Sequence, residues 1–313
     1  MTMRADSLGL ALSILLVAGP SSGQGRPAAD PIIQAGTTVQ VSEHVWGIPD
    51  QYVPLVPNVG IVVGSTATLV VDTGLGPRNG EIVLQEVDRL SANDRLYVVS
   101  THYHPEHSLG LAGLGEEALL VIPRIQQEEM ANGEGIKNAF ARRSDVTADL
   151  LRDVEYPKAD ILFEDELTLD LGGLTARVFH LGTLHTRGDA LIFIEEDRVL
   201  FAGDVIMQGL FPSLDGNDGS IRRWQEVLDT LEALNPSAII GAHGSFGDIA
   251  MIDSWRQLFG TLLSEVRAVK EQGMSEADAA GKLTSEFSVT YPQWPSDARR
   301  MNAAVRVAWR ELP

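Results

Sequence analysis

The sequence predicts an α/β fold made of two similar halves and followed by a helical C-terminal segment. Short runs of apolar, β-branched residues alternate with stretches of helical period, which is the pattern of strands and helices packed around a common core. Two strand-rich stretches, 37–71 and 161–202, are each followed by a helical stretch, and this indicates the two halves. Residues 249–313 have a helical pattern, with breaks near Gly273 and at 291–295.

The composition is that of an ordinary globular chain with an acidic surface. Of its 313 residues 44% are hydrophobic, and the formal net charge is −19. An excess of negative charge repels phosphate backbones, so nucleic acid is a poor candidate partner. The chain has no cysteine. Any metal site must therefore be built from histidine and carboxylate side chains.

The first 23 residues have the pattern of a secretory signal peptide. Arg4 and the amino terminus provide positive charge, residues 8–19 are apolar, and small residues up to Gly23 offer a cleavage site. The apolar stretch is too short to span a bilayer comfortably, so a retained anchor is the less favoured alternative. We expect a periplasmic or secreted protein without membrane contact once the leader is removed, with a linker at 24–36.

The first half contains runs of apolar and β-branched residues that predict strands at 37–45, 59–63, 67–71, 96–101 and 119–122. The second and third of these form a hairpin, because Gly64 and Ser65 lie between them. Helical spacing is present at 79–90, 109–114 and 124–152, the last interrupted at 132–135. The insertion 124–152 is expected to be either a lid over a site or a solvated excursion of the chain.

The second half repeats the pattern, with strands predicted at 161–169, 175–179, 190–194, 198–202 and 238–240. A helix is predicted at 221–234, where Pro236 follows the last turn. The loop 207–220 is expected to form a pocket wall together with the insertion 124–152. In the C-terminal segment, Ser275 is expected to cap the start of a helix.

The most informative stretch is 101–107, which reads T-H-Y-H-P-E-H. It follows the end of a predicted strand, and Pro105 forces the chain to turn. His102 and His104 are two residues apart, so an extended backbone places them on one side, where they can bind one ion. The glutamate and the third histidine follow the turn and can face a second ion. Taken alone, the motif is also compatible with a coincidental polar loop or loose metal binding.

Three further strand ends carry potential metal ligands, namely His185, Asp204 and His243. Loops at the ends of strands that point the same way meet at one edge of a sheet, so residues distant in sequence can converge there. Two zinc-like ions need about seven or eight protein donors, including a shared one. The chain offers His102, His104, Glu106, His107, His185, Asp204 and His243.

These motifs, in this order, resemble those of the metallo-β-lactamase superfamily of metal-dependent hydrolases. The matching stretches are V-V-D-T-G at 70–74, H-Y-H-P-E-H at 102–107, H-T-R-G-D at 185–189, F-A-G-D at 201–204 and A-H-G at 242–244. Two positions depart from the family pattern, because Glu106 replaces an aspartate and Ala242 replaces a glycine. The resemblance implies an αβ/βα four-layer sandwich over 37–248, with metals at one edge of two facing sheets. The helical segment 249–313 would pack on the same domain.

The resemblance implies two zinc ions that share Asp204 as a bridging ligand. The first would be held by His102, His104 and His185, and the second by Glu106, His107 and His243. Glutamate is one methylene longer than aspartate, so the Glu106 carboxylate must fold back or the second ion must move. An enzyme with a single metal ion is therefore the alternative.

Other residues are expected around the metal ions. Asp72 would orient a ligand from behind, and His180 and Asp189 would stabilise a ligand or its loop. Candidates for substrate contact on the pocket walls are Phe211, Tyr156, Arg142 and Arg143, although each is also typical of ordinary core or surface. No role is assigned to His44.

The resemblance implies hydrolysis by a metal-bound hydroxide, because a bound cation lowers the pKa of water from about 15.7 to near 7. Glu106 or Asp204 would act in catalysis by orienting this nucleophile. The one G-x-S-x-G match, at 19–23, lies in the predicted leader, so no serine nucleophile is expected. The expected partner is a small-molecule carbonyl substrate. An ester, lactone or thioester is favoured over a β-lactam, because an aspartate at position 204 resembles the lactonase and thioesterase branches of the family.

Three alternatives remain open. A secretory leader suits a periplasmic β-lactamase that hydrolyses β-lactam amides. A non-enzymatic metal-binding protein of the same fold is expected if Glu106 has disturbed the metal geometry. An iron-dependent redox enzyme is less favoured, because the chain has no fused flavin-binding segment. Nothing in the sequence indicates the oligomeric state.

Overall fold

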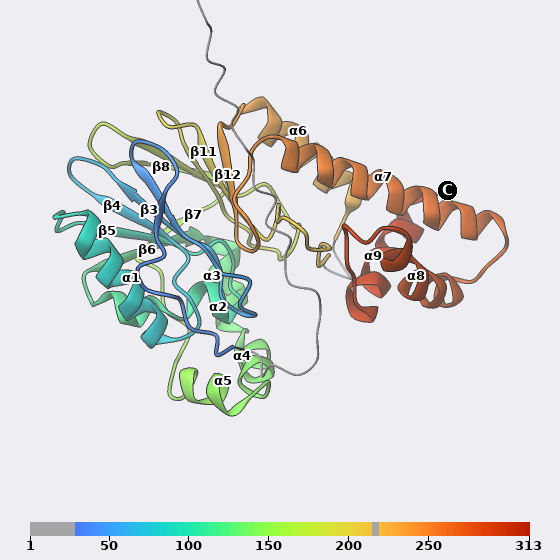
Figure 1. Ribbon diagram of the computed structural model, residues 1–313, viewed down its shortest axis with the longest axis horizontal. Coiled ribbons are helices and arrows are strands. Elements are labelled where there is room, and N and C mark those ends of the chain that lie inside the picture. Colours follow the sequence, from blue (N-terminus) through green and yellow to red (C-terminus); the bar gives the residue numbers. More distant parts are fainter. Residues whose placement is uncertain (1–28, 215–218) are drawn as a thin grey trace, which may run out of the picture.

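Two β-sheets face each other at the centre of the computed structural model, which describes residues 29–214 and 219–313 (Figure 1). The predicted leader 1–23 lies outside the described residues. The first sheet contains, in spatial order, β1 (Val39–Gln40), β2 (Val45–Ile48), β3 (Val59–Val63), β4 (Thr68–Val71), β5 (Leu96–Val99), β6 (Ala118–Pro123) and β7 (Ile161–Phe163). The second contains β12 (Ala238–Gly241), β11 (Val199–Gly203), β10 (Leu191–Ile194), β9 (Thr175–Phe179) and β8 (Glu166–Asp170).

The central strands are buried on both faces, and their side chains alternate between two hydrophobic layers. In β3, Val59 and Ile61 lie in the layer outside the first sheet, whereas Val62 lies in the layer between the sheets. In β10, Ile192 lies between the sheets and Leu191 lies outside the second sheet. Successive side chains of a strand point to opposite faces, so a strand covered on both sides is apolar at every position. This explains the continuous apolar runs of the sequence.

Helices cover the outer face of each sheet and complete an αβ/βα sandwich (Figure 1). On the first sheet lie α1 (Pro77–Leu90) and α3 (Arg124–Ala131), and Val83 of α1 is fully buried in the layer beneath. On the second sheet lies α6 (Ile221–Ala233), with Trp224 buried against it. The predicted fold class is confirmed.

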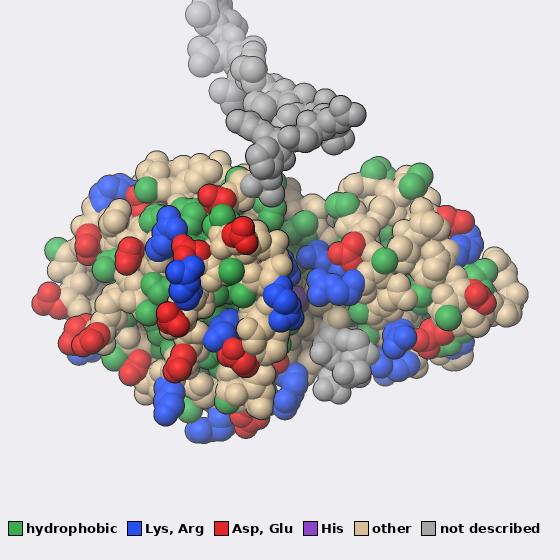
Figure 2. All heavy atoms as spheres, turned by 90° about the horizontal axis from the view of Figure 1, so that it is seen from below, with side chains coloured by type: hydrophobic (Ala, Val, Ile, Leu, Met, Phe, Trp, Pro, Cys, Tyr) green, Lys and Arg blue, Asp and Glu red, His purple; other side chains and the backbone are tan. Residues whose placement is uncertain are grey.

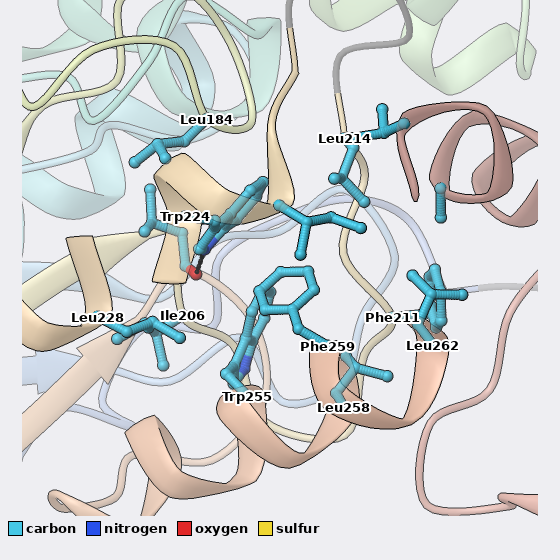
Figure 3. Close-up of a cluster of buried hydrophobic side chains, with 14 of the residues drawn as sticks. Leu184, Ile206, Phe211, Leu214, Trp224, Leu228, Trp255, Leu258, Phe259 and Leu262 are labelled. Atoms are coloured by element: carbon cyan, nitrogen blue, oxygen red, sulfur yellow. Dashed lines mark hydrogen bonds between the residues drawn. The ribbon is translucent and has the colours of Figure 1, made fainter. Parts of the chain in front are cut away.

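The C-terminal helices α7 (Ala250–Glu271), α8 (Glu276–Thr290) and α9 (Ala298–Glu311) extend the core of the second sheet. Figure 3 shows this core, in which the ring of Phe259 lies 5.6 Å from Trp224 and 5.8 Å from Trp255, measured between centroids. The indole N–H of Trp224 donates to the carbonyl of Val205 at 3.1 Å. As expected, the Ser275 hydroxyl caps α8. Within the described part of the chain, no helix combines the length and the apolar character needed to cross a membrane.

Two predicted strands are each split in the structure. The predicted strand 37–45 is wrong, because the chain turns tightly between β1 and β2, with the Val41 N–H donating to the Val45 carbonyl at 2.8 Å. The predicted strand 161–169 is also wrong, because β7 belongs to the first sheet and β8 to the second. The chain crosses between the sheets at Glu164 and Asp165, which are too polar for either interior.

The structure refines the helical predictions near the histidine cluster in two places. Residues 109–114, predicted to begin a helix, contain a single turn of 3-10 helix, η1 (Leu111–Leu114), which follows α2 (Pro105–Ser108). The insertion 124–152 consists of α3, α4 (Glu134–Ala141) and α5 (Asp145–Leu150). Its first break is at Asn132 and Gly133 alone, and Gly135 lies within α4.

His44, to which the sequence assigned no role, connects the two sheets. It follows β1, and its Nδ1 lies 2.8 Å from Oδ1 of Asp197 in the turn between β10 and β11. The Ser42 hydroxyl and the His44 N–H also donate to the Asp197 carboxylate. The hydrogen bond to Asp197 raises the pKa of His44 above 6.5. Burial opposes the hydrogen bonds at Asp197, but the bonds from Ser42 and His44 prevail and lower its pKa below 3.8.

We predict that His44→Gln lowers the free energy of unfolding more at pH 5.5 than at pH 8.5. The raised pKa of His44 contributes stability below pH 6.5, and this is lost as pH rises through the folded-state pKa. The lowered pKa of Asp197 contributes stability above pH 3.8, and this is lost only in acid. The difference is expected to stay below about 1 kcal/mol, because the imidazole is partly exposed and screened. Urea denaturation at both pH values measures it, with Glu81→Gln, an exposed change on α1, as control. An equal loss at both pH values would refute the ion pair.

Candidate metal centre

The predicted ligands follow the ends of parallel strands, except for His185, which lies in the loop between the antiparallel strands β9 and β10. β4 and β5 run parallel, so Asp72 after β4 and the histidine cluster after β5 lie at the same edge of the first sheet. β11 and β12 also run parallel, and Asp204 and His243 follow their ends. The two edges meet where Gly203 contacts Thr101, because a Cβ on Gly203 would lie only 2.8 Å from the Cβ of Thr101. A larger residue at 203 would force the two edges apart.

One group of candidate ligands consists of His102, His104 and His185, whose ligand atoms lie within 4.8 Å of one another. The Nδ1 of His104 lies 3.0 Å from Nε2 of His102 and 3.2 Å from Nε2 of His185. Two nitrogens bound to one tetrahedral zinc ion, each at about 2.1 Å, are roughly 3.4 Å apart. The spacing of the three imidazoles therefore suits a single ion.

A second group consists of Glu106, His107 and His243, which satisfy the same distance limit. Oε1 of Glu106 lies 4.0 Å from Nε2 of His107. Glu106 and His107 share the single turn of α2, which begins at Pro105. The longer side chain of glutamate thus reaches the donor atoms of the other two residues.

Asp204 lies between the two groups. One of its oxygens is 3.4 Å from Nε2 of His185, and the other is 3.8 Å from Nε2 of His107 and 3.7 Å from Nε2 of His243. Its carboxylate thus faces imidazoles from both groups, which is the position of a shared ligand.

Several polar atoms at this centre are buried without a hydrogen-bond partner among the described residues. They are Oε2 of Glu106, Nε2 of His107 and Oδ1 of Asp204. A buried polar atom left without a partner costs about 1–3 kcal/mol. A cation bound between these atoms would remove that cost, so the donor set fits metal ions.

Hydrogen bonds behind the imidazoles orient their Nε2 atoms toward the centre. Nδ1 of His107 lies 2.9 Å from Oδ2 of Asp72. The rings of His185 and His243 bond through Nδ1 to the carbonyls of Ser213 and Val56, at 2.8 Å and 3.0 Å. Because a carbonyl can only accept, these two Nδ1 atoms carry the proton and leave Nε2 free to bind a metal.

Asp72 is held in a strained but well-supported conformation. Its φ of 63° is in the left-handed region, which aspartate tolerates better than most residues. The Thr101 N–H and hydroxyl both donate to its carboxylate, at 2.7 Å and 2.9 Å. With His107, the carboxylate therefore has three partners, and they fix its orientation.

The ionisable groups respond to burial and to one another. Burial lowers the pKa of His102 and His104 well below 6.5, which leaves them neutral. At Asp204, burial favours the protonated acid, but the neighbouring imidazoles prevail and lower the pKa below 3.8. Burial raises the pKa of Glu106 to about 7. At His107, burial is outweighed by the charge of Asp72 and its hydrogen bond, and the pKa rises to about 9.

A loop at residues 49–58 supports the centre, and the sequence analysis missed it. Asn58 donates from its side chain to the carbonyls of Gly241 and Gly244, at 2.7 Å and 2.8 Å. The Asp50 carboxylate accepts from the Gly244 N–H at 2.9 Å. These bonds hold both sides of His243. The cluster of prolines and polar residues in this stretch was the available signal.

His180 and Asp189 lie close to the centre but are not among the candidate metal ligands. Asp189 is buried, and its carboxylate accepts from the N–H and the hydroxyl of Thr186. It thereby fixes the turn that carries His185. His180 bonds through Nδ1 to the Asp189 carbonyl at 2.9 Å.

The residues predicted to contact substrate lie in different environments. The prediction that Phe211 contacts substrate is wrong, because its side chain is fully buried and packs against Phe287 in the core. Tyr156 is half-buried beside Tyr103, and its hydroxyl has no hydrogen-bond partner among the described residues. Arg142 and Arg143 are exposed at the end of α4.

We predict that Asp72→Asn weakens zinc binding at the second group by about 10–100-fold, the usual effect of losing a residue that orients a ligand. Asparagine tolerates the left-handed backbone, but its amide would face the donors of Thr101 and has no charge to offer His107. Titration of the metal-free protein with zinc against a chromophoric chelator measures the affinity. The exposed Asp88→Asn is the control, and unchanged affinity in Asp72→Asn would contradict the role of Asp72.

Comparisons with known proteins agree with this geometry. The family model described as "Metallo-beta-lactamase superfamily" matches residues 52–243. The chain is 24% identical over 210 residues to a metallo-beta-lactamase type 2 of Bacteroides fragilis, covering 65% of this chain and 76% of that protein. It is 27% identical over 213 residues to the acyl-coenzyme A thioesterase MBLAC2 of Homo sapiens, covering 61% and 74%.

Solved structures have the same fold. A metallo-beta-lactamase from Pontibacter korlensis has a TM-score of 0.55 at 18% identity, covering 69% of this chain and 94% of that chain. The sec-alkylsulfatase Pisa1 from Pseudomonas sp. has a TM-score of 0.63 at 13% identity, covering 88% and 50%. The family model spans more than half of the chain, and the protein belongs to the metallo-β-lactamase superfamily.

Proposed function

We propose that this protein is a zinc-dependent hydrolase that cleaves a small carbonyl substrate, namely a thioester, ester or lactone. The observation that carries the proposal is the position of Asp204, whose carboxylate lies within 3.8 Å of three imidazole nitrogens from separate parts of the chain. A purely structural zinc site is closed by four protein ligands. Here, instead of one such set, the donors form two adjacent groups around a shared carboxylate, which suits a two-metal site.

His102, His104 and His185 would hold one ion, and Glu106, His107 and His243 would hold the other. Bound zinc supplies a nucleophile at neutral pH by lowering the pKa of water to near 7, and it polarises the carbonyl of the substrate. Asp204 would contact both ions.

Side chains of this protein orient the metal ligands and the attacking water. Asp72 keeps the Nδ1 proton of His107 and so directs Nε2 toward the centre. The free oxygen of Glu106 or of Asp204 accepts a hydrogen bond from the attacking water and orients it. These carboxylates are almost completely buried, which strengthens their electrostatic effect on a bound substrate.

A thioester is the first choice of substrate. The human relative is named an acyl-coenzyme A thioesterase, and the chain matches 74% of its length. A thiol has an ordinary pKa of about 8.5, so it leaves as a thiolate near neutral pH with little need for a general acid. An alkoxide or an amine leaves much less readily.

A β-lactam is the second candidate. It is favoured by the 24% identity to the Bacteroides fragilis metallo-beta-lactamase over 210 residues. Hydrolysis of either substrate needs the same water and the same metal ligands, so the pocket walls must distinguish between them.

We propose a periplasmic or secreted location on the basis of the leader pattern at 1–23. Expression of the full chain in a Gram-negative host is expected to yield a mature protein that lacks these residues in the periplasmic fraction. Intact mass measures this directly. A protein that keeps Met1 and stays in the cytosol would refute the location and leave the proposed chemistry untouched.

The proposed function predicts about two zinc ions per chain and turnover that a chelator abolishes and zinc restores. The test assays metal content and the hydrolysis of a butyryl thioester, a butyryl lactone and a chromogenic cephalosporin. Asp204→Asn is expected to lower kcat/KM by at least about 100-fold, because it disturbs both ligand groups. Asp88→Asn, an exposed change on α1, is the control.

Each other outcome selects a different function. Hydrolysis of the cephalosporin alone would identify a β-lactamase. Bound zinc without turnover of any substrate would favour a metal-binding protein. Tightly bound iron with oxygen consumption would favour a redox enzyme and refute the hydrolase.

A further inference from the structure

Positive charge gathers at the mouth of the metal centre, although the whole chain has a formal net charge of −19. Figure 2 shows a groove between the sandwich and the C-terminal helices, where a histidine is visible and Lys or Arg side chains lie on both rims. Two parts of the chain supply arginines there, the insertion 124–152 and the start of α9. Neither part carries a candidate metal ligand.

Arg143 lies on the rim formed by the insertion. Its guanidinium carbon is 4.1 Å from the centroid of the Phe140 ring, which is buried and lies 6.1 Å from the ring of His104. A guanidinium group stacked on an aromatic ring keeps its orientation and its free N–H donors. Phe140 therefore places Arg143 on the side of the centre where His104 lies.

Arg299 and Arg300 lie in the first turn of α9, on the side of the C-terminal helices. Arg300 donates from Nη1 to the carbonyl of Phe211 at 2.7 Å, and Ser213, two residues further, accepts from His185. Arg300 therefore fixes the loop that orients a candidate ligand. Arg299 is exposed beside it, and its charge acts on His104.

These arginines are not neutralised by the carboxylates that the structure describes. No such carboxylate lies within 4 Å of Arg143, Arg299 or Arg300, whereas Arg256 contacts both Asp229 and Glu232. The guanidinium groups of Arg143 and Arg299 have no hydrogen-bond acceptor among the described residues, so their N–H donors can bind an anion from solution.

We propose that the substrate carries a negatively charged group, a carboxylate or a phosphate, which Arg143 and Arg299 bind from opposite rims of the groove. The inference rests on the proposed hydrolase and defines the class of its substrate. Guanidinium groups bind both anions through paired N–H donors. Arg300 is a positioning residue, because it acts through the loop of Phe211 and Ser213.

The charge can reside on the leaving group or on the acyl group, and three thioesters distinguish these cases. Butyryl-N-acetylcysteamine is neutral, butyryl-coenzyme A carries phosphates on the leaving group, and succinyl-N-acetylcysteamine carries a carboxylate on the acyl group. All three contain the same reacting bond. The variants are Arg143→Gln, Arg299→Gln and the double variant, and the control is Arg267→Gln, which removes an exposed charge from the far end of α7.

We expect the zinc-loaded protein to prefer one anionic thioester to the neutral one by at least about 10-fold in kcat/KM, the effect of one charge-assisted hydrogen bond. Each arginine variant is expected to raise KM for that substrate by about 10-fold, with little change in kcat, zinc content or hydrolysis of the neutral thioester. Arg267→Gln is expected to behave like the wild type. The preferred substrate identifies the source of the charge.

Binding without turnover separates this inference from the proposed function. Calorimetry with the thioethers S-butyl-coenzyme A and S-(3-carboxypropyl)-N-acetylcysteamine measures affinity for the two kinds of anion. Arginine-dependent binding of either one by a protein that hydrolyses nothing would support the anion site and refute the hydrolase. Equal hydrolysis of charged and neutral thioesters, unaffected by the arginine variants, would refute the anion site and support the hydrolase. Binding of neither thioether would overturn the anion site as well.

Discussion

Parallel pairing of strands at two facing sheet edges is the constraint on which the metal centre depends. Parallel neighbours end at the same edge, so β4 and β5 deliver Asp72 and the histidine cluster together, and β11 and β12 deliver Asp204 and His243. Close approach of Gly203 to Thr101 then joins the two edges. The helix layers on both outer faces allow strands buried on both sides, and such strands hold their ends rigidly.

The centre concentrates buried charge that the surrounding protein has to offset. The Asp72 carboxylate takes part in three hydrogen bonds, whereas Asp204 faces imidazoles at 3.4–3.8 Å and has one oxygen without a hydrogen-bond partner among the described residues. Buried ionised groups are costly unless they are paired. These buried donors lower the stability of the metal-free protein, and a bound cation would complete their coordination. Such a cost is expected where residues are selected for function rather than for stability.

The metal donors could be predicted from the sequence, because clustered histidine and carboxylate side chains indicate metal binding without any knowledge of long-range contacts. Packing does not explain why a loop has histidines at 102, 104 and 107. The continuous apolar runs of β3, β5 and β10 indicate strands that are buried on both faces. The switch of sheets at Glu164 and the burial of Phe211 depend on contacts between distant segments, and no local pattern carries that information. The support given by Asn58 to the His243 loop was missed for the same reason.

The sandwich carries one part of the site, and two segments added to it, the insertion 124–152 and α9, carry another. The candidate metal ligands are carried by the sandwich, whose strand ends have little freedom, while the arginines at the mouth are carried by an insertion and by α9. Arg143 and Arg299 are exposed on these additions, so they can change without disturbing the sheets. The metal-dependent reaction and the choice of substrate can thus vary independently. Membership of the superfamily therefore does not define the substrate, whereas the charge of the groove rims narrows its chemical class.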